Sequence, residues 1–82
     1  MPDIRGGLLL KQEQAIGDVD SINVDFSTSK RYIPNTLSVY LNGQILTRGI
    51  DFIETTNQIF AMTNPPINTL NYTDIVMVEY QQ

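Results

Sequence analysis

The sequence contains no cysteine, no histidine and no tryptophan. Without cysteine, the chain cannot form disulfides, bind zinc through thiolates or use a thiol as a nucleophile. Without histidine, it lacks the most frequent general base and the commonest metal ligand of proteins. These absences argue against an enzyme and against a metal or other cofactor. They favour a binding or structural module.

Positive charge is also scarce, with 5 Lys and Arg against 9 Asp and Glu and a net charge of −4. Only Lys30 and Arg31 are adjacent, whereas affinity for nucleic acid depends largely on clustered basic side chains that neutralise phosphates. Leu8-Leu9-Leu10 is an apolar run, but no run approaches the roughly 20 residues that cross a bilayer. We therefore expect neither a nucleic acid nor a membrane as a partner.

The length of 82 residues fits one domain. A chain this small buries only about 60–65% of its unfolded surface. Small domains without disulfides or metals often gain stability by assembly with other chains. We expect a homo-oligomer, or a protein present in many copies on a larger particle.

The first 18 residues have no regular period and are interrupted by Gly6, Gly7 and Gly17. We predict that residues 1–18 form an N-terminal arm and that residues 19–82 form the domain. Leu8, Leu9 and Leu10 would then pack on a neighbouring subunit, because exposed consecutive leucines are otherwise a liability. The alternatives are a fraying terminus or a first strand of the same domain, and the sequence leaves open whether the arm is a helix or a strand.

From Asp20 onward the apolar residues follow the period of β-strands. In residues 21–26 the side chains of Ile22, Val24 and Phe26 alternate with polar ones, which predicts a half-buried strand. Further strands are predicted over residues 58–63 and 74–80, with a polar loop over residues 68–73. Strands at intervals of about 8–12 residues with turn signals between them predict an all-β fold, either a small antiparallel β-sandwich or an open barrel.

Residues 36–48 carry the clearest local signal, because Asn42-Gly43 lies between two apolar runs. This dipeptide favours a type I′ turn, which needs positive φ at both central residues. The two-residue loop places Tyr40 opposite Ile45 on one face of the hairpin. The other face supplies part of the predicted core, which comprises Leu37, Val39, Leu41, Leu46, Val76, Val78 and Tyr80.

The last strand places Ile75 and Met77 on the face opposite Val76 and Val78. Two interpretations remain open: the strand is buried on both faces, or Ile75 and Met77 belong to an apolar stripe that meets another subunit. With the outward face of the hairpin and the arm, the predicted interface residues are Leu8, Leu9, Leu10, Tyr40, Ile45, Ile75 and Met77.

A calcium ion and a sugar are two other candidate ligands, and the sequence supports them more weakly. The acidic residues near Asp18 resemble the start of a calcium loop, but Asn23 and Ser29 stand where an EF-hand needs Gly and Glu. The four tyrosines could stack on a sugar, although tyrosines on strands more often close the edge of a core. They are Tyr32, Tyr40, Tyr72 and Tyr80.

The region from Tyr32 to Tyr80 resembles a recurring module of tailed-bacteriophage virion proteins. The resemblance is carried by Pro34, the Tyr40-x-Asn42-Gly43 hairpin, Gly49-x-Asp51-Phe52, Pro65-Pro66 and the strand from Asp74 through Val78 to Tyr80. Such modules occur in tail fibres, in baseplate and neck proteins, and in head decoration proteins.

The resemblance implies a virion structural protein that is made in the host cytoplasm and binds capsid, neck or tail subunits. Because the chain has no repetitive shaft, we expect a multi-copy cement, decoration or connector subunit. The alternative is a tail-fibre or baseplate component, including a carbohydrate-binding module for host recognition.

Overall fold

The computed structural model describes residues 10–82, and its regular structure consists of short β-strands. All six pairings between named strands are antiparallel, so the predicted all-β class is confirmed. Within these residues no helix is long and apolar enough to span a membrane. The strands are β1 (Leu10–Gln14), β2 (Asp25–Ser27), β3 (Ser38–Leu41), β4 (Gln44–Ile45), β5 (Phe52–Glu54), β6 (Ile59–Met62), β7 (Asn68–Thr69), β8 (Tyr72–Thr73) and β9 (Val76–Gln81).

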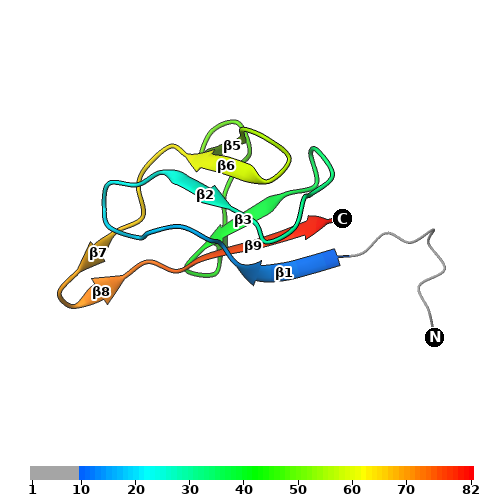
Figure 1. The fold of residues 1–82 in the computed structure, drawn as a ribbon. Coiled ribbons are helices and arrows are strands. Elements are labelled where there is room, and N and C mark those ends of the chain that lie inside the picture. Colours follow the sequence, from blue (N-terminus) through cyan, green and yellow to red (C-terminus); the bar gives the residue numbers. More distant parts are fainter. Residues whose placement is uncertain (1–9) are drawn as a thin grey trace.

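The strands form two main sheets and a separate hairpin. The larger sheet has the order β1-β9-β3-β4, and the smaller has the order β2-β6-β5. The two sheets lie one over the other, and the β7–β8 hairpin extends beyond them at one end (Figure 1). The arrangement is that of a small β-sandwich.

The core lies between the two sheets and is rich in aromatic rings. The Phe60 ring is 6.0 Å from that of Phe26 and 6.2 Å from that of Phe52, and Tyr32 meets Tyr80 edge-on at 6.0 Å. Of the predicted core residues, Leu41 and Leu46 are only partly buried at its margin. The other five are buried: Leu37, Val39, Val76, Val78 and Tyr80.

The hairpin at Asn42-Gly43 forms as predicted. Both turn residues have positive φ, 52° for Asn42 and 87° for Gly43, as a type I′ turn requires. Tyr40 is the partner of Ile45 across β3 and β4. The local turn chemistry therefore sets the register of this part of the larger sheet.

The part of the predicted arm that the structure describes belongs to the sandwich. Residues 10–14 form β1, which pairs along its whole length with β9, from Leu10 opposite Gln81 to Gln14 opposite Met77. The domain therefore includes β1 and does not begin at residue 19. Leu8 and Leu9 lie outside the described residues.

The prediction of a strand over residues 21–26 is wrong at its start. Ile22 is 80% exposed, and Ser21 has a φ of 70°. The Asp20 carboxylate accepts hydrogen bonds from the backbone N–H groups of Ile22 and Asn23, so a turn replaces the expected alternation. The strand begins only at Asp25. The loop expected over residues 68–73 is also wrong, because those residues form the β7–β8 hairpin.

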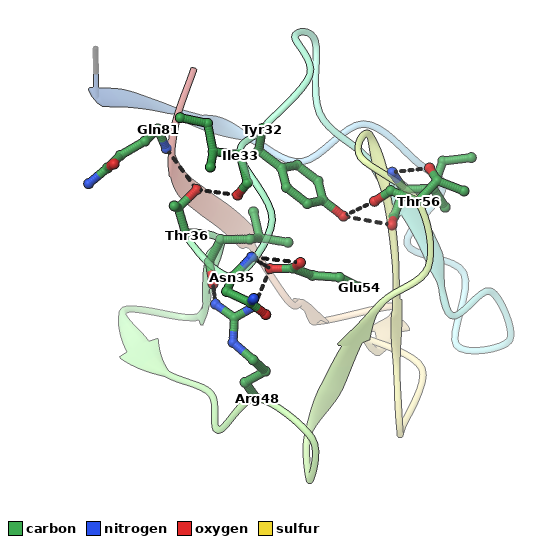
Figure 2. A network of polar contacts seen from close by, with 10 residues as sticks. Tyr32, Ile33, Asn35, Thr36, Arg48, Glu54, Thr56 and Gln81 are labelled. Atoms are coloured by element: carbon green, nitrogen blue, oxygen red, sulfur yellow. Dashed lines mark hydrogen bonds and ion pairs between the residues drawn. The ribbon is translucent and has the colours of Figure 1, made fainter. Parts of the chain in front are cut away.

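The loop between β2 and β3 ties the two sheets together (Figure 2). The Ile33 N–H donates to the Gln81 carbonyl on β9 at 2.8 Å. The Glu54 carboxylate on β5 accepts from the Asn35 N–H at 3.0 Å and forms an ion pair with Arg48. These contacts reach both layers, so the loop fixes the separation of the sheets.

Candidate interaction surface

The outer face of the larger sheet carries most of the predicted interface residues. The strand registers place Gln14 beside Met77, Met77 beside Tyr40, and Tyr40 beside Ile45, so these four residues form one row across the sheet. Ile75 precedes β9 and is 52% exposed at one end of this face. We call this face, with the row and its neighbours on β1, β3, β4 and β9, the outer face.

Apolar side chains remain open to solvent on the outer face. Ile45 is 63% exposed and Met77 is 37% exposed, while Tyr40 is half-buried. Leu10 lies at the opposite end of the same face and is also largely exposed. The structure thus brings Tyr40, Ile45 and Met77 together and leaves Leu10 apart from them.

A shallow hollow of about 370 Å³ lies on the outer face. Tyr40, Gly43 and Met77 contribute to its lining. The polar part of the lining is a pair in which the Gln12 amide donates to the Glu79 carboxylate at 2.5 Å. The hollow therefore combines an aromatic ring with a hydrogen-bonding rim.

The side chain of Asn42 holds the β3–β4 turn through hydrogen bonds to residues 72–75. Its amide donates to the Tyr72 hydroxyl at 2.6 Å and to the Asp74 carboxylate at 2.8 Å. Its carbonyl accepts from the Ile75 N–H at 2.8 Å, and its own N–H donates to the Ile75 carbonyl. Asn42 therefore joins the β3–β4 turn to the segment that leads into β9.

Asp74, which the sequence predicted only as the start of the last strand, is a buried carboxylate. Hydrogen bonds from Tyr72, the Ile67 N–H and Asn42 lower the pKa of Asp74, against the opposing effect of burial. The hydrogen bond between Tyr72 and Asp74 also raises the pKa of the Tyr72 hydroxyl. With these partners the carboxylate is satisfied within the fold, which indicates a structural role. A lone Asp before a strand gives no distinctive signal in a single sequence.

Glu13 forms a second network that links β1 to the loop after β2. Its carboxylate accepts from the Tyr80 hydroxyl at 2.6 Å, and from the Ser29 N–H at 2.8 Å and hydroxyl at 2.6 Å. Burial raises the pKa of Glu13, but the bonds from Ser29 and Tyr80 outweigh it and the pKa is lowered. Burial and the nearby Glu13 raise the pKa of Tyr80. The network spans residues far apart in sequence, so spacing alone does not reveal it.

The alternative ligand sites are not assembled as units. Among residues 10–82 no three acidic side chains are grouped to hold a metal ion. Tyr32 and Tyr80 are in the core, so the four tyrosines do not form one surface for a sugar. Tyr40 alone lies in the hollow of the outer face.

No protein-family model, curated protein sequence or solved structure matches this chain.

Proposed function

We propose that this protein is a non-enzymatic structural subunit of a tailed-bacteriophage virion, present in many copies as a cement, decoration or connector protein. The outer face binds capsid, neck or tail subunits. The virion assignment rests on the resemblance of residues 32–80. The observation that carries the binding role is the row of Met77, Tyr40 and Ile45 across the larger sheet.

The exposure of apolar side chains over the described chain supports assembly with other proteins. Thirteen large hydrophobic residues are exposed, whereas ten hydrophobic residues make up the buried core. Single exposed apolar residues are common on protein surfaces, but apolar side chains gathered on one face mark interaction sites. On the outer face the central residues are apolar and Gln12 and Glu79 are polar, the composition of a protein interface.

The proposal is tested by incorporation of the chain into virus particles. Particles are assembled with the wild-type chain, with Ile45→Lys or with Ile53→Lys, purified, and analysed by quantitative mass spectrometry. Ile53 is a matched control, because it is also exposed, at 55% against 63% for Ile45, but lies on β5 in the other sheet. We expect Ile45→Lys to reduce incorporation about tenfold, the effect of about 1.4 kcal/mol, and Ile53→Lys to leave it unchanged.

Absence of the wild-type chain from purified particles would refute the virion role. Equal incorporation of both variants would refute the role of the outer face. Circular dichroism melting of the two variants checks that both fold like the wild type, as expected for exposed positions.

A second candidate function is carbohydrate binding by a tail-fibre or baseplate component. The observation that favours it is the hollow, where the Tyr40 ring lies with the Gln12–Glu79 pair. Aromatic rings and paired amide and carboxylate groups are suited to stack on and hydrogen-bond a sugar ring. If the protein binds carbohydrate, multimerised protein should give a signal on a glycan array, and Tyr40→Ala should abolish that signal. A cement subunit should give no sugar-dependent signal.

A further inference from the structure

Among residues 10–82, the outward edge of β1 is the longest strand edge of the two sheets that has no neighbouring strand. The N–H of Ala15, the residue that follows β1, donates to the carbonyl of Val76 in β9, whereas Ile16 exchanges hydrogen bonds with Ser27 of β2 on the other side. Because these directions alternate along a strand, the backbone groups of Leu10, Gln12 and Gln14 point away from β9. Within residues 10–82 these groups have no backbone partner. β1 also lies at the rim of the described fold (Figure 1).

The other edges are shorter. β4 at the opposite edge of the larger sheet has two residues, and the edge strands β2 and β5 of the smaller sheet have three each. Short edges are one way in which proteins prevent unwanted strand pairing. β1 has five residues, so it presents the greatest number of free groups to an incoming strand.

The sequence of β1 is self-complementary in one antiparallel register. Pairing must place outward-pointing residues opposite each other, so Gln12 of one copy can face Leu10, Gln12 or Gln14 of another. In the register where Gln12 faces Leu10, Lys11 of one copy lies opposite Lys11 of the other. In the register where Gln12 faces Gln14, Glu13 lies opposite Glu13. Only the register with Gln12 opposite Gln12 sets each Lys11 opposite Glu13. Opposite charges directly across a strand pair stabilise it, and like charges destabilise it.

We propose that two copies of this chain pair through β1, antiparallel and two-fold symmetric about Gln12. Lys11 and Glu13 of each copy then face each other at non-hydrogen-bonded positions, where side chains approach most closely. The two larger sheets join into one sheet of eight strands, and their outer faces become continuous. The pairing does not depend on the virion role. A contact of five residues per copy belongs to the small, weak class of interfaces, so it is expected at high protein concentration or on a particle.

A cysteine introduced into β1 tests the register, because the natural chain has none. In the proposed pair the two Gln12 Cα atoms are about 5.5 Å apart, within the range that a disulfide spans. The two Gln14 Cα atoms are about 13 Å apart along the strands, which no disulfide spans. Both side chains are exposed, so Gln12→Cys and Gln14→Cys are matched variants. Under mild oxidation, Gln12→Cys is expected to form a covalent dimer and Gln14→Cys to remain monomeric.

Charge reversal provides a second test that does not need oxidation. Lys11→Glu alone and Glu13→Lys alone each set like charges opposite in a self-pair, but a mixture of the two variants restores both attractive pairs. Sedimentation analysis is expected to show weakened dimers for each variant and a recovered dimer for the mixture. Glu13→Lys also loses the contacts with Ser29 and Tyr80, so its folding is checked by circular dichroism. If Glu13→Lys does not fold, the comparison of Gln12→Cys with Gln14→Cys is the test of the proposed pairing.

The inference is overturned if Gln12→Cys stays monomeric under oxidation at concentrations up to about 0.5 mM, a weak-affinity range. It is equally overturned if Gln14→Cys crosslinks as fast as Gln12→Cys, since the copies then meet in another register or through another surface. Loss of this dimer would not affect incorporation through Ile45, so its failure is distinguishable from failure of the proposed function.

Discussion

Replacing Asn42 by Ala tests whether the hairpin turn and its side-chain contacts hold the larger sheet together. Asn42 has a φ of 52°, and a left-handed conformation costs Ala about 1 kcal/mol. The variant also loses the bonds with the Asp74 carboxylate and the Ile75 N–H. Because the Asn42 side chain is itself exposed, each of these bonds is valued low, at about 0.5–1 kcal/mol. We expect the free energy of unfolding to fall by about 2–3 kcal/mol.

This loss is large for so small a domain. At about 0.05–0.15 kcal/mol per residue, a domain of this length is stable by roughly 4–12 kcal/mol. The melting temperature should therefore fall by about 10–20 °C. Urea denaturation measures the change, which should appear as a lower midpoint with an unchanged slope if the variant still folds in two states.

Asn42→Gly is the matched control, because glycine adopts positive φ without strain but makes no side-chain bonds. We expect it to be about 1 kcal/mol more stable than Asn42→Ala. Equal stability of the two variants would show that backbone conformation contributes nothing at this position. A loss below about 1 kcal/mol in Asn42→Ala would show that the contacts with Asp74 and Ile75 do not stabilise the fold.

Three further predictions concern stability. Gly17→Ala should destabilise by at least about 2 kcal/mol in thermal melts, because Gly17 has a φ of 153° and a Cβ there would lie 2.6 Å from Phe26 Cδ2; a neutral result would contradict this packing. The pKa values of Glu13 and Asp74 are lowered, so their stabilisation is present above their unfolded pKa of about 4 and is lost as pH falls through the folded pKa. The urea midpoint of unfolding should therefore fall as the pH is lowered, and it should fall less steeply in Asp74→Asn than in the wild type. Burial and the nearby Glu54 raise the pKa of Tyr32 to about 12, so its stabilisation is present below pH 10 and is lost as pH rises towards 12; the phenolate absorbance should show a late step that Tyr32→Phe removes.

Features encoded by neighbouring residues could be predicted from the sequence. The Asn42-Gly43 turn specifies its own conformation, and the alternation after Asp74 correctly separates the buried Val76 and Val78 from the exposed Met77. In both cases the signal and its structural effect lie within a few residues.

Features that depend on distant partners could not be predicted. The period of residues 21–26 was misleading, because the Asp20 side chain bonds the backbone and leaves Ile22 outside the core. β1 is a strand because β9, more than 60 residues later, supplies its hydrogen bonds, and its own sequence alternates only weakly. The Glu13 network likewise needs the folded loop that brings Ser29 to β1.

The order of strands in the larger sheet has a consequence for synthesis. β9 is the last of the described strands to leave the ribosome, yet it lies between β1 and β3 and pairs with both. Until it emerges, neither neighbour has its central partner, and β1 has no pairing in that sheet. Only local elements such as the β3–β4 hairpin can form early, and the long loop between β1 and β9 closes in one late step. Nascent chains stalled before Val76 should therefore be sensitive to protease and should bind chaperones, even though eight of the nine described strands have already been made.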